Sequence, residues 1–200
     1  MASRDDADRV HPETVPAWRA WFEGHRDRGA GVWLVTWRKA AGHPDLTYDQ
    51  AVEVALAFGW VDSTARKLDE QRTMLWFAPR KARSGWSRPN KVRVARLQAA
   101  GLMDPAGQRA VDAAVADGSW TLLDEVEDLV VPPDLAAALA ETGGRAQWDA
   151  FPPSARRGIL EWVVQAKRPQ TRAKRIAETA ALAARGERAN QWTPRDPGSG

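Results

Sequence analysis

The sequence predicts an α+β protein, in which a small antiparallel sheet of about three strands packs with helices and a helical C-terminal part follows. Apolar residues alternate with period 2 only before residue 80, as expected of strands with one buried face. After residue 80, helical spacing and proline- or serine-led starts predominate. A chain of 200 residues that is 44% hydrophobic and 28% charged has the composition of a globular protein with a buried core.

A helix and a strand are predicted before residue 39. The helix begins after Thr14, because four side chains recur at helical spacing, namely Trp18, Trp21, Phe22 and His25. The strand covers residues 32–38 and alternates between two faces, with Trp33, Val35 and Trp37 on one face and Val32, Leu34 and Thr36 on the other. Residues 40–46 contain Gly42 and Pro44 and predict a loop.

A capped helix comes next. Thr47 and Gln50 have the spacing of a capping box, in which each side chain bonds to the backbone amide of the other residue. Gly59 stands where a left-handed C-terminal cap belongs. We therefore expect a helix that begins after Thr47 and ends before Gly59.

A β-hairpin follows this helix. Residues 60–67 and 72–78 predict two antiparallel strands joined by a turn at 68–71, and Pro79 ends the second strand. Strict alternation along the first strand would place four side chains on one face, namely Trp60, Asp62, Thr64 and Arg66. On the second strand it separates Thr73, Leu75 and Phe77 from Arg72, Met74 and Trp76.

The rest of the chain predicts helices around an acidic, partly irregular stretch at 120–131. The expected helices are 87–100, 104–117, a short one from 132, 152–167 and 169–186. This pattern divides the chain into four parts, namely a disordered N-terminus over 1–12, an α+β part over 13–103, a helical part over 104–187 and a disordered tail over 188–200.

The charge of the chain is segregated along the sequence. Residues 58–93 and residues 155–188 each hold nine Lys/Arg against three Asp/Glu, a net +6, whereas residues 104–141 hold one against nine, a net −8. The whole chain carries only +3. Because the acidic segment can neutralise basic charge within the same molecule, net charge alone says little about partners.

The aromatic/basic block, residues 58–93, is the strongest candidate for a binding surface. It holds three of the eleven tryptophans beside its nine cations. Aromatic rings next to fixed positive charge favour flat or anionic ligands. The candidate ligand-binding residues are Trp60, Asp62, Lys67, Arg72, Phe77, Arg80, Trp86, Asn90 and Lys91.

These residues have two interpretations. In the first, the cations supply charge and forked hydrogen bonds, the aromatic rings supply a stacking wall and Asp62 orients the cations. In the second, the sheet is simply amphipathic, Trp60 packs in the core and Asp62 makes an ordinary ion pair. The sequence supports both about equally.

The basic loop at 79–91 leaves a similar choice. Unpaired amides at the start of the helix near Ser87 would form a site for a phosphate, a carboxylate or an acidic peptide, together with Arg80, Lys81, Arg83 and Lys91. Alternatively, Ser87 only caps the helix and the loop is solvated. On the last helix, Arg168, Arg172 and Arg175 share a face, and we expect them to pair with the acidic segment.

The sequence shows no template for catalysis, metal binding or membrane insertion. It has no cysteine, and its three histidines have no metal-ligand spacing. It contains neither a glycine-rich phosphate loop nor a G-x-S-x-G motif. It has no apolar run of about 18 residues and no secretory signal. We therefore expect a cytoplasmic protein with no membrane span, no catalytic residue, no metal and no cofactor.

Several short segments in sequential order also share their residues with a known family. They include residues 46–52 (LTYDQAV), 57–62 (AFGWVD), 77–81 (FAPRK), 84–87 (SGWS) and 151–157 (FPPSARR). Over roughly residues 30–187 the chain resembles the bacterial YdeI/OmpD-associated (bacteriocin-protection) family. The resemblance implies a link to survival of cationic antimicrobial peptides or bacteriocins and to an outer-membrane porin. It implies no reaction and no cofactor.

Together these observations predict a non-catalytic binder of an anionic small molecule or acidic peptide, with a role in stress or antimicrobial resistance. A nucleic-acid-binding protein that uses the same block and the arginine-rich last helix is the alternative. Its affinity would fall steeply with salt, because each neutralised phosphate releases counterions. An uncharacterised enzyme is a further alternative.

Overall fold

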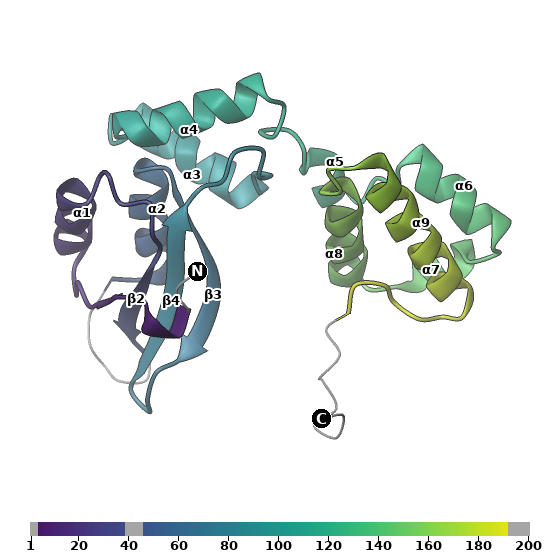
Figure 1. Ribbon diagram of the computed structural model, residues 1–200, viewed down its shortest axis with the longest axis horizontal. Helices are drawn as coiled ribbons and strands as arrows, with labels where there is room; N and C mark the ends of the chain where they lie inside the picture. The colour runs from purple at the N-terminus through teal and green to yellow at the C-terminus, as the bar shows by residue number, and fades with distance from the viewer. Residues whose placement is uncertain (1–3, 39–45, 192–200) are drawn as a thin grey trace. The chain divides into compact units, whose positions relative to one another are not determined.

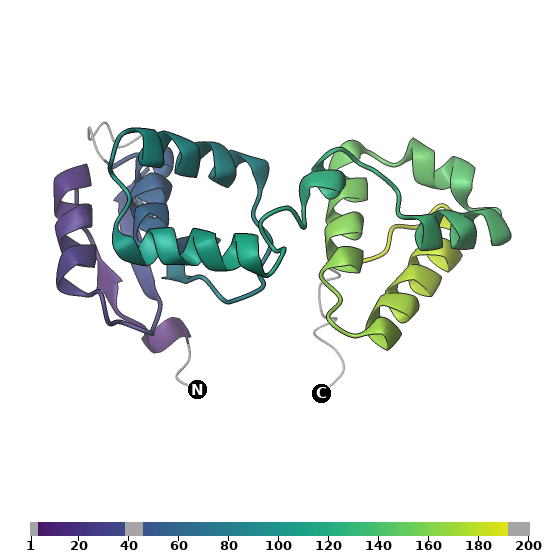
Figure 2. The ribbon, with the colours of Figure 1, turned by 90° about the horizontal axis from the view of Figure 1, so that it is seen from above.

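The computed structural model describes residues 4–38 and 46–191, which form two compact units (Figures 1 and 2). The N-terminal unit comprises residues up to Ser84 together with Pro89–Trp120, and the C-terminal unit comprises Gly85–Arg88 and the chain from Thr121. The α+β class is confirmed, although the sheet has four strands among the described residues rather than about three.

The sheet of the N-terminal unit has the order β1-β2-β4-β3. Its strands are β1 (Arg9–Val10), β2 (Val32–Trp37), β3 (Trp60–Lys67) and β4 (Arg72–Pro79). β1 runs parallel to β2, and the other neighbours are antiparallel. The predicted hairpin is therefore present as β3 and β4, and β4 also pairs with β2 at the centre of the sheet.

The fourth strand comes from a segment that the sequence predicts to be disordered. Within the predicted disordered N-terminus, Arg4–Asp6 form a 3₁₀ helix, η1, and Arg9–Val10 form β1; residues 1–3 lie outside the described residues. The reason is the sheet face underneath, where an apolar cluster needs cover from solvent, namely Trp33, Val35, Met74 and Trp76. Ala7 packs against this cluster.

Helices α1 (Val15–Gly24) and α2 (Tyr48–Ala57) lie on the other side of the sheet, as Figure 1 shows. Thr14 caps α1, and Thr47 with Gln50 forms the predicted capping box at α2. Trp18 is fully buried between the helices and the sheet, where its ring contacts Phe77. The predicted loop at 40–46 lies outside the described residues except for Leu46, which is buried.

A bulge in β3 changes the predicted distribution of its side chains. Asp62 pairs with Phe77, and the next pair is Ala65 with Leu75. Between these two pairs β3 advances by three residues, whereas β4 advances by only two. One extra residue reverses the alternation beyond it. Asp62 therefore shares the helix-covered face with Phe77, whereas Arg66 pairs with Met74 on the opposite face. The prediction that Trp60, Asp62, Thr64 and Arg66 share one face is wrong.

Helices α3 (Arg88–Ala99) and α4 (Pro105–Ala116) lie across the end of the sheet at which β4 ends (Figure 1). α4 is fixed to α2, because the Asp104 amide donates to the Ala57 carbonyl over 3.0 Å and Gly107 lies directly against that carbonyl. α4 thus belongs to the N-terminal unit, whose second segment is Pro89–Trp120.

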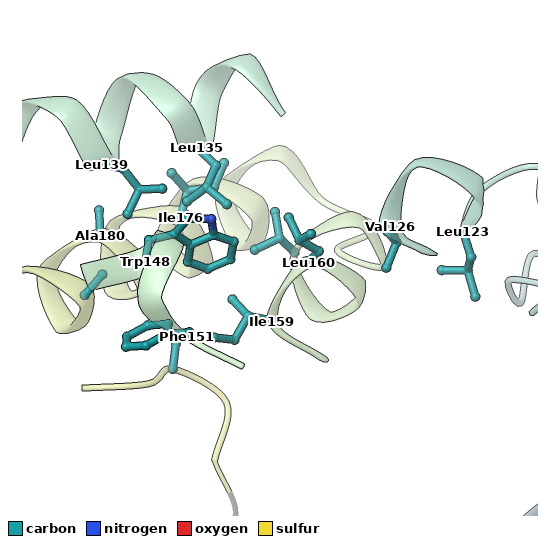
Figure 3. Close-up of a cluster of buried hydrophobic side chains, with 13 residues drawn as sticks. Leu123, Val126, Leu135, Leu139, Trp148, Phe151, Ile159, Leu160, Ile176 and Ala180 are labelled. Atoms are coloured by element: carbon teal, nitrogen blue, oxygen red, sulfur yellow. The ribbon is translucent and has the colours of Figure 1, made fainter. Parts of the chain in front are cut away.

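The C-terminal unit is helical. Its helices are α5 (Asp124–Glu127), α6 (Pro133–Glu141), α7 (Arg145–Ala150), α8 (Pro153–Val164) and α9 (Pro169–Ala184). Their apolar faces enclose one core in which the indole of Trp148 lies among leucine and isoleucine side chains (Figure 3). A core of this kind stabilises short helices that would not form alone in water.

Part of the predicted tail, residues 188–191, lies among the described residues. Ala189 is buried in the core of the C-terminal unit, and the Arg188 guanidinium lies 5.9 Å from the centre of the Phe151 ring. Residues 192–200 of the predicted tail lie outside the described residues. On α9, Arg172 pairs with Asp134 over 2.7 Å, which agrees with the expected pairing between the arginine-rich helix and the acidic segment.

Gly107→Ala should destabilise the N-terminal unit by about 1–3 kcal/mol. A Cβ atom at this position would lie 2.1 Å from the Ala57 carbonyl oxygen, which is backbone and cannot turn away. Gly158→Ala is the matched control, since a Cβ there meets nothing within 4 Å and alanine favours the helix by up to about 1 kcal/mol. Chemical denaturation of both variants measures the difference, and equal stability would contradict the close packing of α4 on α2.

Candidate functional site

The three candidate aromatic residues are all buried. Trp60 is 4% exposed and contacts Phe22 edge-on, with ring centres 5.2 Å apart. Phe77 is fully buried, and Trp86 is 1% exposed within the C-terminal unit. Their positions correspond to the second interpretation, an amphipathic sheet with a tryptophan in the core. Their role in ligand binding stays a prediction.

Lys67 and Arg72 lie at the tip of the β3–β4 hairpin. Lys67 pairs with Glu70, and Arg72 pairs with Asp69 over 2.7 Å while its guanidinium lies over the Trp37 ring. Lys67 stands five positions after Asp62 on β3. At the usual rise of a β-strand, this spacing corresponds to a distance of about 17 Å. These two cations therefore belong to the hairpin tip and do not meet the other candidates.

The N-terminus of α3 has acidic side chains as partners. The Arg88 amide donates to Glu127 Oε1 over 2.9 Å, and the Arg88 guanidinium donates to Asp128 Oδ1 over 2.8 Å. Both carboxylates come from the acidic segment. The Glu127 carboxylate lies where the sequence suggests a bound anion, because it meets both the Arg88 amide at the start of α3 and the basic Arg88 side chain.

Asp62, Arg80 and Asn90 belong to a polar cluster in the N-terminal unit. We call it the Arg80 cluster and define it by five residues, namely Tyr48, Asp62, Arg80, Asn90 and Arg93. They come from the first turn of α2, the start of β3, the end of β4 and the first two turns of α3. The side chains of Tyr48 on α2 and Asp62 on β3 meet directly.

Tyr48 and Asp62 form the direct contact between α2 and β3 in this cluster. The Tyr48 hydroxyl donates to Asp62 Oδ2 over 2.9 Å, and the residue is 56% exposed. Partial burial, the hydrogen bond to Asp62 and the Asp62 charge raise the pKa of the Tyr48 phenol, while the Arg93 charge opposes them. The phenol therefore stays a hydrogen-bond donor well above neutral pH.

Arg80 follows β4, and its amide donates to the Gly59 carbonyl over 3.0 Å. This bond holds the backbone of Arg80 beside the left-handed turn at Gly59, whose φ is 77°. Burial lowers the pKa of the Arg80 guanidinium to about 10, although the negative charge of Asp62 favours the charged form. The guanidinium is still positive at neutral pH, but its surroundings stabilise that charge less well than water does.

Arg93 links the cluster to the N-terminal turns of α2 and α3. Its side chain is only 13% exposed, donates to Asn90 Oδ1 over 3.0 Å and pairs with Asp49. Planar guanidinium groups with several fixed donors suit carboxylates and phosphates. The cluster thus contains two arginines, a phenol and an amide, with the carboxylate of Asp62 bonded to the phenol and that of Asp49 paired with Arg93.

The sequence predicted only part of this cluster. Asp62, Arg80 and Asn90 are among the predicted residues, whereas Tyr48 and Arg93 are not. Arg93 stands three residues after Asn90 on a predicted helix, which is a spacing that brings side chains together. The contact between Tyr48 and Asp62 has no such local signal, because it depends on how α2 packs against β3.

The described residues contain no group of three or more His, Asp or Glu side chains placed to hold a metal ion. In the same part of the chain, no helix is long and apolar enough to cross a membrane. The fold and the cluster therefore define an α+β unit with a polar, arginine-containing cluster, joined to a helical unit.

Comparison with known protein families adds the identity of both units. Residues 10–110 match the family model described as "Domain of unknown function (DUF8412)", and residues 128–186 match the one described as "Bacteriocin-protection, YdeI or OmpD-Associated". The first match covers half of the chain, so the protein belongs to that domain family of unknown function and carries a YdeI/OmpD-associated segment after it. No curated protein and no solved structure matches the chain significantly.

The predicted YdeI/OmpD-associated identity is confirmed, but it covers less of the chain than roughly residues 30–187. The family match falls within the C-terminal unit, whereas the Arg80 cluster lies within residues 10–110, the region of the other family model. The two parts of the protein can therefore have separate roles.

Asp62→Ala should lower the pKa of the Tyr48 phenol, because it removes both the accepting carboxylate and its negative charge. Tyr48 is the only tyrosine of the chain, so the absorbance of tyrosinate as a function of pH reports on this residue alone. Asp149→Ala, on the surface of α7, is the control and should leave the titration unchanged. A titration that Asp62→Ala does not move would contradict the contact between α2 and β3.

Proposed function

We propose that the N-terminal unit binds a small anionic ligand, through its carboxylate or phosphate group, at the Arg80 cluster. The observation that carries this proposal is that the guanidinium groups of Arg80 and Arg93 both lie near the hydrogen-bonded pair of Tyr48 and Asp62. The negative charge of Asp62 favours the charged form of Arg80. An anion that approaches the two guanidinium groups would gain from their positive charge, and reduced contact with water strengthens that interaction.

The other residues of the cluster suit this role. Arg93 adds a second planar guanidinium that is held by Asn90 and Asp49, so less side-chain freedom is lost when a ligand binds. Tyr48 offers an exposed ring beside the cluster for a flat ligand group. Asp62 fixes the Tyr48 hydroxyl, and its negative charge favours the charged form of Arg80.

Binding without catalysis fits the cluster better than a reaction. Covalent catalysis needs a nucleophile within hydrogen-bond reach of a base. The hydroxyl that contacts Asp62 belongs to Tyr48, whose pKa is raised rather than lowered, which makes it a weaker nucleophile at neutral pH. Arginine groups stay protonated and do not act as bases at neutral pH.

We further propose a role in bacterial stress or antimicrobial-peptide resistance, with the cytoplasm as the compartment. The support is the description of the family that matches the C-terminal unit, which names bacteriocin protection. In this proposal the C-terminal unit connects the protein to the protective response and the N-terminal unit senses the anionic ligand.

Anions that bind the Arg80 cluster should stabilise the N-terminal unit, by about 2.7 kcal/mol at a hundredfold excess over Kd. Thermal unfolding is measured with inorganic phosphate, citrate and nucleoside phosphates, and the increase in Tm should disappear in Arg80→Gln. Arg96→Gln is the matched control, since this arginine of α3 is 65% exposed and pairs with Glu53 of α2.

Two results would contradict the proposal of anion binding. One is that none of the anions raises the Tm of the wild-type protein. The other is that Arg80→Gln and Arg96→Gln respond alike, which would indicate general screening of positive charge. Tight binding to DNA or RNA that weakens steeply with salt would instead favour the nucleic-acid alternative.

Expression of the protein should increase the survival of a bacteriocin-sensitive bacterium, and Arg80→Gln should reduce this effect if ligand binding drives protection. Counting colonies after exposure to a bacteriocin measures survival, with Arg96→Gln as the control. Protection that persists unchanged in Arg80→Gln would separate the protective role from the Arg80 cluster. No protection by the wild-type protein would contradict the role itself.

A further inference from the structure

The face of the sheet opposite α1 and α2 is covered by a short segment of chain. Figure 1 shows η1 in front of the sheet, on the side away from α2. We call residues 4–10 the N-terminal strap. Beneath it lies the apolar cluster of Trp33, Val35, Met74 and Trp76, in which Trp33 is 1% and Trp76 is 8% exposed.

Backbone groups hold the strap along β2. The Trp33 amide donates to the Asp8 carbonyl over 2.9 Å, and β1 continues this pairing in parallel register, with Arg9 opposite Trp33 and Val10 opposite Leu34. The Trp33 indole N–H donates to the Arg4 carbonyl over 2.7 Å. The pairing at Asp8–Val10 recognises an extended main chain, and the indole bond recognises a carbonyl of η1. Neither depends on the side chains of the strap.

Acidic side chains of the strap meet fixed arginines of the sheet and of the segment before β2. Asp5 pairs with Arg66 over 2.5 Å, and Asp8 pairs with Arg28 over 2.8 Å. The Arg66 guanidinium also lies 5.1 Å from the centre of the Trp33 ring. This cation–π contact helps to hold the arginine in position. The strap thus offers two carboxylates three residues apart to two arginines that belong to the body of the protein.

The contacts of the strap are weak relative to what it covers. Ala7 is the apolar strap residue that packs against the cluster. The carboxylates of Asp5 and Asp8 are 72% and 67% exposed in their ion pairs, and exposed pairs contribute little to stability. β1 has only two residues. Segments with few buried contacts open more readily than the rest of a fold.

We propose that this face is a docking site for an acidic peptide of a partner protein, which replaces the N-terminal strap on β2. The peptide would add to β2 as a parallel strand and place two carboxylates, three residues apart, on Arg66 and Arg28. In the absence of the partner, the strap occupies the site and keeps Trp33 and Trp76 out of water. The strap is therefore a built-in competitor that raises the concentration of partner needed for binding.

Charge complementarity and the main-chain contacts favour an acidic peptide over other occupants. The arginines meet carboxylates, and the backbone N–H and the indole N–H of Trp33 both donate to backbone carbonyl groups of the strap. A single-stranded nucleic acid could satisfy the arginines but has no strand-like main chain to pair with β2. The site lies on the sheet face opposite Asp62, so it is independent of anion binding at the Arg80 cluster.

The test uses the full chain and a fluorescent synthetic peptide with the sequence of residues 1–12. In the double variant Asp5→Lys/Asp8→Lys the strap loses both ion pairs, so the peptide should bind at least about tenfold more tightly than to the wild-type protein. Fluorescence anisotropy measures binding. Asp149→Lys is the control for an added positive charge, and a peptide with serine in place of its three aspartates should bind at least about tenfold more weakly.

Several outcomes would overturn the proposal. They are equal peptide binding by the double variant and the wild-type protein, equal binding of the aspartate and serine peptides, and displacement of the peptide by single-stranded DNA at lower concentration than by unlabelled peptide. A double variant that fails to fold would also count against it, since the strap would then be an integral part of the core.

Hydrogen exchange of the unmodified protein provides a second measurement. If the strap opens on its own, the Trp33 amide, which donates to the strap, should exchange at least about tenfold faster than the amides of the β2–β4 ladder. Equal protection of Trp33 and of that ladder would show that the strap opens only when the whole unit unfolds. In that case a partner peptide could not replace it under native conditions.

Discussion

A one-residue bulge in β3 between Asp62 and Ala65 is the constraint on which both proposed sites depend. Before the bulge, Asp62 faces α2 and meets Tyr48, which builds the Arg80 cluster. After the bulge, Arg66 lies on the opposite face, where it contacts Trp33 and Asp5. An unbroken strand would send Asp62 and Arg66 to the same face, and one of the two arrangements would be lost.

Part of the basic charge of this protein is neutralised by ion pairs within the chain. Glu127 and Asp128 pair with Arg88 at the start of α3, and Asp134 pairs with Arg172 on α9. The cations of the two proposed sites, Arg80, Arg93 and Arg66, instead lie beside other fixed groups of the N-terminal unit. In these proposals their surroundings, rather than the net +3 of the chain, determine which ligand they favour.

Local signals gave the secondary structure of the sheet and of most helices. The capping box at Thr47, the proline starts and the alternation along β4 each act over a few residues, so the sequence alone shows them. The candidate site was harder to predict, because tryptophans in an aromatic/basic block serve stacking and core packing equally well. Trp60, Phe77 and Trp86 are buried, whereas Asp62 contacts Tyr48 and Asn90 contacts Arg93.

The sequence by itself determined the α+β class, the hairpin, the helix caps and the relation to the YdeI/OmpD-associated family, since these depend on short patterns of residues. Only the tertiary structure decided which arginines lie near which carboxylates, that α4 joins the N-terminal unit and that residues 4–10 cover an aromatic face. The physical reason is that burial and charge pairing join residues far apart in the chain. Tyr48 and Asp62, or Asp5 and Arg66, meet only after the sheet has formed.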